Sequence, residues 1–487
     1  MDKKTFNKWN MMVAVLAFLV SAVTYLATIE PTASFWDCGE FIASSYKLEV
    51  GHPPGNPVFQ LFARVATIPF GPEKAAVVVN AMNGILSALT IFFLYLTIVF
   101  FAKRLLRSPI RSGMTERGPG MTERGPGMTE RGPGMTEEYS IPQAIAIFGS
   151  GLVGALAYTF SDTFWFSAVE GEVYAMSSLF TAIVFWAMCR WYETADEPHA
   201  NRWIVLISLL MGLSIGVHLL NLLTIPAFVF MYYYRKNEDR HLPFGKLLGI
   251  FMIGVVIEFV LVYLFIPYFP KLAAFFDRIF VNGFGLPYNT GALFFLIAVL
   301  ALCFWALFAT LKKGNVFLNT VTLCATTLVI GFSLFAIVII RSSVKTPTNE
   351  YQPDNPYTLV RYLGREQYGS NPLIYGQYFD APYDLKTTKY WAPLDGKYVK
   401  VDGPADADYR PEGKMLFPRM FSSADPRYIS FYEQYTGGKG ERVRGAKHRK
   451  PTFGANMAYF LDYQLNWMYW RYFMWNFVGR QNEIHSP

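Results

Sequence analysis

The chain has 487 residues, of which 53% are hydrophobic and 16% are charged. This balance excludes an ordinary soluble domain and is typical of a protein that crosses a membrane several times. A net charge of +7 would suit nucleic-acid binding, but Lys and Arg in membrane proteins gather in cytoplasmic loops, so we predict no nucleic-acid partner. The four cysteines show no CxxC spacing, so neither a disulfide framework nor a cysteine metal site is expected.

Nine apolar runs predict the transmembrane helices. Three lysines precede the first run, from Met11 to about Ala27, which we interpret as an uncleaved span with a cytoplasmic amino terminus. We expect each run to cross about 30 Å of hydrocarbon as a helix. The later runs lie near 80–102, 142–160, 174–192, 203–219, 221–234, 245–268, 291–311 and 316–340. The predicted fold is an α-helical polytopic bundle of about nine transmembrane helices.

The basic residues orient this bundle. With the amino terminus inside, the predicted inner segments hold 18 Lys and Arg residues and the outer loops hold 5. The positive-inside rule therefore places residues 28–55, and everything after Arg341, on the outer face.

Composition divides the chain into a transmembrane domain, 1–340, and an extracytoplasmic mixed α/β region, 341–487, where turn residues and short strands are expected. Repeats of GMTERGP at 113–138 break helices with Gly and Pro, so they predict a flexible cytoplasmic linker. The aromatic segment Met457–Phe477 suits either a helix at the membrane interface or a helix buried against the bundle.

The first outer loop carries acidic and aromatic candidates around a Pro-Pro-Gly turn, namely Glu30, Trp36, Asp37, Glu40 and His52. Asp37 and Glu40 are three residues apart, which would place both carboxylates on one face of a short helix. Such a carboxylate serves as a general base or metal ligand, although an N-cap or solvated acidic turn has the same spacing. Because the loop is unusually apolar and turn-rich, we interpret it as a functional site.

Other outer residues are candidates for substrate binding. A second acidic loop precedes the predicted span at 174–192 and, being on the same side, could meet the first in one cavity. A lone His in an apolar run is more often a packing residue, and exposed charge is the default for each outer cation. The candidates are Arg64, Asp162, Glu170, Glu172, Tyr174, His218 and Asn221.

Five segments carry a family resemblance: SFWDCGEFIASSYKLEVGHPPGNP, AVEGEVYA, GVHLLNLLTIP, TNEYQPDNPYTLVRYLGREQYG and RYFMWNFVGRQNE. They resemble the bacterial members of glycosyltransferase family 117, relatives of protein O-mannosyltransferases with the membrane GT-C fold. The resemblance covers nearly all the chain apart from the GMTERGP repeats. Family members usually continue beyond the last of these segments, so a chain shorter than its family is expected.

The resemblance implies a GT-C enzyme that moves a sugar from a polyprenyl-phosphate carrier to a Ser or Thr hydroxyl of an exported protein. The reaction would occur at the periplasmic face of the bacterial inner membrane. By similarity, Asp37 is the base that deprotonates the acceptor, with inversion at the anomeric carbon. Glu40 orients Asp37 or the acceptor, and His52 shapes the donor pocket. The expected partners are the lipid-linked donor, the acceptor protein and membrane lipid. The resemblance does not decide whether a divalent metal ion takes part.

Two other classes of function compete with this interpretation. A polyprenyl-lipid transporter would also have many spans, but it would favour paired broken helices or inverted repeats, and the sequence shows no such internal symmetry. A non-catalytic membrane subunit would fit a chain shorter than its family.

Overall fold

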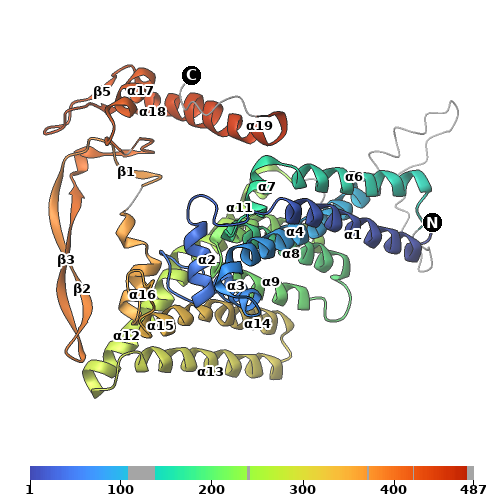
Figure 1. The fold of residues 1–487 in the computed structure, drawn as a ribbon, viewed down its shortest axis with the longest axis horizontal. Coiled ribbons are helices and arrows are strands. Elements are labelled where there is room, and N and C mark those ends of the chain that lie inside the picture. The colour runs from blue at the N-terminus through green and yellow to red at the C-terminus, as the bar shows by residue number, and fades with distance from the viewer. Residues whose placement is uncertain (108–137, 238–241, 370–371, 421, 480–487) are drawn as a thin grey trace. The chain divides into compact units, whose positions relative to one another are not determined.

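The computed structural model describes residues 1–107, 138–237, 242–369, 372–420 and 422–479. The predicted linker therefore lies, apart from its last residue, outside the described residues. The chain forms two compact units, one from Met1–Ala274 and Ala292–Leu359, the other from Phe275–Gly291 and Val360–Pro487. All strands among the described residues belong to the second unit (Figure 1).

The first unit is helical. The chain passes between the units within α12 (Ile266–Phe284), near the start of α13 and within α16 (Pro356–Leu363). The other helices are α1 (Lys3–Ala27), α2 (Cys38–Lys47), α3 (Pro57–Thr67), α4 (Ala75–Arg107), α6 (Ile141–Thr159), α7 (Asp162–Ala168), α8 (Val173–Thr194), α9 (Arg202–Ile215), α10 (Ile225–Lys236), α11 (Phe244–Phe259), α13 (Thr290–Lys312), α14 (Val316–Phe332) and α15 (Ala336–Ser343).

Seven helical segments among the described residues are long and apolar enough to cross a membrane, which confirms a multi-pass membrane protein. They correspond to seven of the nine predicted runs. The other two runs, near 203–219 and 221–234, form the shorter helices α9 and α10, of 14 and 12 residues. At 1.5 Å per residue these reach only about 21 and 18 Å. Conversely, the predicted run 245–268 continues as one helical segment to Phe284.

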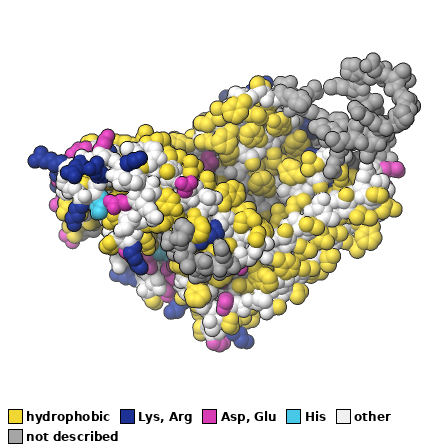
Figure 2. Space-filling model, turned by 90° about the horizontal axis from the view of Figure 1, so that it is seen from above, with side chains coloured by type: hydrophobic (Ala, Val, Ile, Leu, Met, Phe, Trp, Pro, Cys, Tyr) yellow, Lys and Arg dark blue, Asp and Glu magenta, His cyan; other side chains and the backbone are white. Residues whose placement is uncertain are grey.

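The outer surfaces of these helices are apolar. Hydrophobic side chains cover broad areas of the face drawn in Figure 2, where charged side chains concentrate in one part. In α13, Leu302, Trp305 and Phe308 are each at least 60% exposed. Exposing such a face to water would be costly, whereas lipid tails are a good solvent for it.

Two buried clusters hold the first unit together. Helix α4 packs against α1, α6 and α8, and the aromatic side chains Tyr25 and Tyr95 are fully buried there. Helix α6 begins with a capping box, in which Ser140 accepts from the backbone of Gln143 and Gln143 accepts in return. The second cluster, including Phe41 of α2 and Phe59 of α3, packs these short helices on α4 and α8. This cluster packs against the first acidic loop, because the ring of Phe41 lies 5.5 Å from that of His52.

The second unit is built from hairpins and short helices. Strands β2 (Tyr383–Leu394) and β3 (Lys397–Tyr409) pair antiparallel around Asp395 and Gly396, both at positive φ, as an Asp-Gly hairpin turn requires. The remaining elements are β1 (Tyr375–Gln377) paired with β4 (Lys414–Leu416), β5 (Gly440–Glu441) paired with β6 (Lys450–Pro451), α17 (Pro426–Thr436), α18 (Phe453–Ala458), a π-helical stretch Tyr459–Trp470 and α19 (Arg471–Val478).

The aromatic segment predicted at 457–477 is helical throughout. Its first part packs inside the second unit, where Tyr459 is buried against Tyr432 of α17. Its later part is more exposed, since the side chains of Trp470 and Phe477 are about half exposed. The segment therefore combines a buried end with an exposed aromatic end.

Candidate functional site

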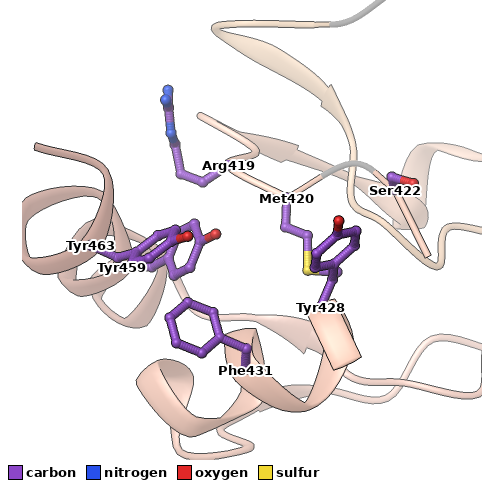
Figure 3. A pocket seen from close by; sticks show the side chains of 7 residues that line it. All are labelled: Arg419, Met420, Ser422, Tyr428, Phe431, Tyr459 and Tyr463. Carbon is purple, nitrogen blue, oxygen red and sulfur yellow. The ribbon is translucent and has the colours of Figure 1, made fainter. Parts of the chain in front are cut away.

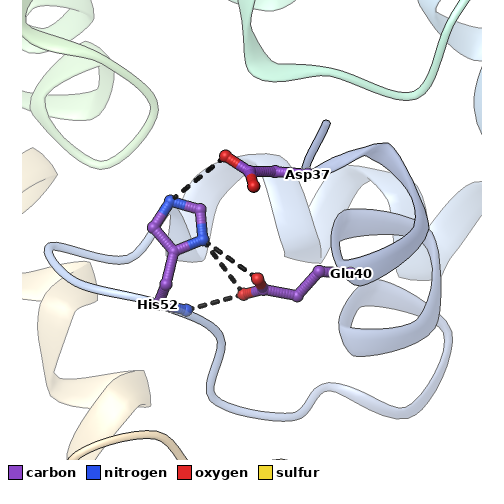
Figure 4. Close-up of side chains that lie close together, drawn as sticks. All are labelled: Asp37, Glu40 and His52. Carbon is purple, nitrogen blue, oxygen red and sulfur yellow. Dashed lines mark hydrogen bonds and ion pairs between the residues drawn. The ribbon is translucent and has the colours of Figure 1, made fainter. Parts of the chain in front are cut away.

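Three predicted residues of the first acidic loop, within residues 28–55, come together. The His52 ring lies between the carboxylates of Asp37 and Glu40, as Figure 4 shows. Its Nδ1 is 3.1 Å from both carboxylate oxygens of Glu40, and its backbone N–H donates to Glu40 Oε1 at 2.6 Å. Its Nε2 is 3.9 Å from Asp37 Oδ2. The three side chains form a carboxylate–imidazole–carboxylate cluster.

Helix α2 positions the two carboxylates. Asp37 occupies its N-cap position, with its carbonyl accepting from the Phe41 backbone, but the Asp37 side chain makes no capping hydrogen bond. The carboxylate, 59% exposed, thus faces His52 and solvent rather than the helix end. Glu40 packs against the chain at Gly51, where a Cβ would collide with its carboxylate. The local fold therefore frees Asp37 and fixes Glu40.

A distant arginine holds the other end of α2. Arg341 donates from Nε to the carbonyl of Leu48 at 2.6 Å and from Nη2 to the carbonyl of Lys47 at 3.1 Å. A cation at the carboxyl end of a helix satisfies its orphan carbonyls and suits its dipole. In the structure Arg341 therefore anchors the loop that follows α2.

The cluster keeps opposite charges side by side. The hydrogen bond to Glu40 raises the pKa of His52, against the opposing effect of burial, and Asp37 adds to the rise. Burial raises the pKa of Glu40, but the hydrogen bonds from His52 outweigh it and lower that pKa overall. His52 therefore favours the imidazolium form, with one N–H held by Glu40 and the other directed toward Asp37.

The second acidic loop is fixed to the first by two asparagines of α4, both fully buried. Asn83 donates from Nδ2 to the carbonyls of Glu170 and Glu172, each at 2.6 Å. One turn earlier, Asn80 donates to the carbonyls of Glu30 and Thr32, at 2.7 and 3.0 Å. Because residues three apart share a helix face, α4 holds both loops from one side.

Two further contacts join the loops directly. The Gly171 backbone N–H donates to Cys38 Sγ at 3.3 Å. A Cβ on Gly171 would lie within 3.2 Å of Ile42, Val79 and Asn80 side-chain atoms, so the second loop approaches this closely only because residue 171 is glycine.

The carboxylates of the second loop are buried, unlike Asp37. Glu170 and Glu172 are 4% and 6% exposed. Burial raises the pKa of Glu172 to about 7, helped by the charges of Glu170 and Asp37. Burial likewise raises the pKa of Glu170, and Glu30 adds to it. The pKa of each of these two carboxyl groups is thus shifted upward, whereas the pKa of Glu40 is shifted downward.

Glu350, which was not among the predicted site residues, joins the site from one of the segments that carry the family resemblance. The backbone around Asn349 pairs with Val50 in a short parallel bridge, and Glu350 N–H donates to the Val50 carbonyl at 3.0 Å. Burial raises the pKa of Glu350, and the charge of Glu40 raises it further. A third chain segment therefore adds a carboxyl group beside the cluster.

Three other predicted residues make contacts around the turn between α9 and α10. Tyr174 packs its ring 5.6 Å from that of His218. His218 Nδ1 accepts from the Leu220 backbone, and Asn221, fully buried, donates to Ser214 Oγ. His218 and Asn221 thus shape the turn between α9 and α10.

The remaining predictions fall on more exposed positions. Trp36 is 89% exposed and adopts positive φ immediately before Asp37. The Arg64 guanidinium lies 5.1 Å from the Tyr46 ring, a cation–π distance. Asp162 is exposed at the first turn of α7, where a carboxylate suits the helix dipole.

One ligand atom from each of Asp37, Glu40 and His52 lies within 4.8 Å of the others. Two carboxylates and an imidazole form a donor set that many divalent ions accept. The hydrogen bonds within the cluster also satisfy these groups without an ion. The arrangement suits proton transfer, with a carboxylate next to an oriented imidazolium.

The sequence contained a signal for the asparagines. Asn80 and Asn83 are polar residues in an otherwise apolar helix, a position where polar groups are costly and usually have a specific partner. Glu350 belongs to a segment that carries the family resemblance, but its place beside the cluster had no local signal, because it depends on a pairing between segments about 300 residues apart.

Comparisons with known proteins concern mainly the first unit. Residues 37–241 match the family model of the protein O-mannosyl-transferase TMEM260 N-terminal domain, and residues 369–461 match a family of unknown function, DUF8416. The matched range begins at Asp37 and includes Glu40, His52 and Glu172. No solved structure matches the chain.

Two curated relatives are distant. Protein O-mannosyl-transferase tmem260 of Dictyostelium discoideum is 22% identical over 191 residues, 39% of this chain and 18% of that protein. Protein O-mannosyl-transferase TMEM260 of Mus musculus is 22% identical over 218 residues, 44% of this chain and 24% of that protein. The chain thus covers less than a quarter of either relative. Over part of its length the chain is therefore similar to the amino-terminal domain of protein O-mannosyl-transferases.

Proposed function

We propose that the protein transfers a sugar from a polyprenyl-phosphate-linked donor to Ser or Thr hydroxyls of exported proteins, at the periplasmic face of a bacterial inner membrane. The observation that carries the proposal is the cluster of Asp37, Glu40 and His52 in the part of the chain that resembles protein O-mannosyl-transferases.

In this mechanism Asp37 takes the proton of the acceptor hydroxyl while the hydroxyl oxygen forms a bond to the anomeric carbon of the sugar. The bond between that carbon and the phosphate oxygen breaks, with inversion, and polyprenyl phosphate leaves. A Ser or Thr hydroxyl is a poor nucleophile at neutral pH, so it needs a base within hydrogen-bond reach. Asp37 suits this task because its carboxylate is exposed and lies beside the cationic form of His52.

Glu40 and His52 assist Asp37 and stabilise the negative charge of the leaving phosphate. Glu40 holds His52 Nδ1, which keeps the ring oriented and favours its protonated form. The imidazolium lies beside Asp37 and offers a cation to the phosphate that leaves. A divalent ion held by the same three residues would serve the phosphate in the same way.

The experiment that tests the function is transfer by the purified full chain in lipid nanodiscs. Polyprenyl-phosphate-linked mannose and a Ser/Thr-containing peptide are supplied, and mass spectrometry measures the added hexose. We expect modification of this peptide and none of a matched peptide with Ala at the acceptor positions. A GDP-mannose arm without lipid-linked sugar tests the donor. Transfer from the nucleotide sugar alone, or no transfer from a panel of lipid-linked sugars, would contradict the proposal.

A further inference from the structure

The second unit contains a small pocket far in sequence from the acidic loops. Its lining includes Arg419, Met420, Phe431, Tyr459 and Tyr463, with Tyr428 at 61% exposure on its rim (Figure 3). Its volume of about 170 Å³ is below the ~300–1,000 Å³ of pockets for drug-sized ligands. A single ring is therefore the size of guest that it admits.

Aromatic side chains form the walls of this pocket. The rings of Tyr459 and Tyr463 lie 5.2 Å apart at 34°, and Phe431 meets Tyr463 edge-on at 4.6 Å. Tyr459 also packs against Tyr432 of α17, so the walls belong to the core of the unit. Such packing gives a rigid apolar surface before any ligand binds.

Two hydroxyl groups lack partners at this surface. In Figure 3 the hydroxyls of Tyr459 and Tyr463 point to the same side, and neither makes a hydrogen bond with any residue that the structure describes. Burial raises the pKa of Tyr459 to about 12, so its hydroxyl keeps its proton. Covering these groups with a purely apolar guest would leave them unsatisfied, which is costly.

The charges argue against ionic guests. None of the described residues that line the pocket is a carboxylate that would favour a cation. Arg419 is the one charged residue among the described lining residues. Its Nε donates to Gln464 at 2.6 Å and its guanidinium lies 4.4 Å from the Phe417 ring. Figure 3 shows that guanidinium directed away from the other lining side chains. The pocket therefore favours a neutral guest with both an apolar face and hydroxyl groups.

A pyranose ring has these properties, because its C–H groups form an apolar face and its hydroxyls lie around the edge. We propose that this pocket binds one hexopyranose ring of a glycan, as a sugar-binding subsite separate from the acidic loops. The inference rests on the proposed glycosyltransferase function only for the origin of the glycan, which would be a donor or an already modified acceptor. Sugar binding itself is measurable without any transfer.

The test uses the full chain in nanodiscs and saturation-transfer NMR with methyl α-hexopyranosides of the manno, gluco and galacto series. We expect signals on ring protons for at least one of them. The double variant Tyr459→Phe/Tyr463→Phe keeps both rings and removes only the hydroxyls, so binding should weaken about tenfold. Tyr435→Phe is the matched control, because Tyr435 contacts both rings without lining the pocket.

Comparison with Asp37→Asn separates the two proposals, since that variant should lose transfer yet bind the hexopyranoside as before. Binding that disappears in Asp37→Asn, or that is unchanged in the double variant, would overturn the pocket proposal. Absence of signal from all three sugars would do the same. So would tighter binding of N-acetyl-phenylalaninamide or inorganic phosphate at this pocket.

Discussion

The two acidic loops lie side by side, yet their carboxyl groups have opposite environments. In the first loop, Asp37 is 59% exposed, and Glu40 is hydrogen-bonded to a histidine that lowers its pKa. In the second loop, Glu170 and Glu172 are buried, and the pKa of Glu172 rises to about 7. Pairs of titratable groups whose environments separate their pKa values often divide the work of base and acid. The comparison assigns the base to the first loop.

The largest expected effect comes from removing that base. Asp37→Asn keeps the size of the side chain but cannot accept the acceptor proton, so the rate of transfer should fall by about 10²–10⁴-fold. The check is mass spectrometry of exported glycoproteins in cells that carry only the variant. Glu73→Gln, an exposed carboxylate in the turn before α4, is the control and should leave glycosylation unchanged. Normal glycosylation with Asp37→Asn would contradict the assignment of the base to the first loop.

The next effect concerns the cation of the first loop. His52→Gln removes the imidazolium between Asp37 and Glu40, and loss of a charged hydrogen bond should cost about tenfold to a hundredfold in kcat. The pH profile is the sharper measurement. Because Glu40 raises the pKa of His52, the wild-type protein should lose the contribution of the cation only as the pH rises above the ordinary value of 6.5. The variant should not show this high-pH loss, and an unchanged profile would argue against the role of His52.

A smaller effect tests how the loops are held together. Asn83→Ala removes the side-chain donor to the carbonyls of Glu170 and Glu172. The Glu170 carbonyl still accepts from the Glu172 backbone, so the main loss is at Glu172, where a buried unpaired group costs about 1–3 kcal/mol. We expect a lower melting temperature in nanodiscs and a reduced rate of transfer. Ser87→Ala is the control, since this buried hydroxyl one turn further along α4 has no hydrogen-bond partner among the described residues. Equal melting temperatures for the two variants would show that the Asn83 hydrogen bonds do not contribute to stability.

The smallest effect is the pH dependence of stability from the second loop. The folded protein holds the Glu172 proton with a pKa of about 7, above the ordinary 4.5. Stability from this group is therefore complete below pH 4.5 and declines as the pH rises through 7, because the folded state then must ionise a buried carboxyl. Glu172→Gln should flatten the melting temperature across this window. A variant with the same slope as the wild type would place the titrating group elsewhere.

Local patterns in the sequence predicted much of the first unit. Seven apolar runs became long helices, and the three-residue spacing of Asp37 and Glu40 matches the short helix α2. The prediction of nine spans was less successful at 203–234, where the helix ends at Ile215 and a new helix begins at Ile225. Hydropathy alone does not register this break around Gly216 and His218, since the residues on either side are apolar.

Long-range packing set the features that the sequence did not predict. The sequence suggested that the two acidic loops could meet. It did not predict that Asn80 and Asn83 would hold them by binding backbone carbonyls, which carry no residue-specific signal. Glu350 enters through a bridge to Val50. Tyr459 and Tyr463 were visible only as members of an aromatic segment, and their shared pocket with Phe431 depends on how α17 packs beside them.

Chemical rescue is the most direct test of the claim that Asp37 is the base. Asp37→Ala in nanodiscs is given lipid-linked sugar and acceptor peptide, with and without added formate, a small carboxylate that fits the space left by the deleted group. If Asp37 is the base, transfer should be almost absent without formate, and its rate should rise with the formate concentration and then saturate. Transfer by Asp37→Ala at the wild-type rate without formate would contradict it.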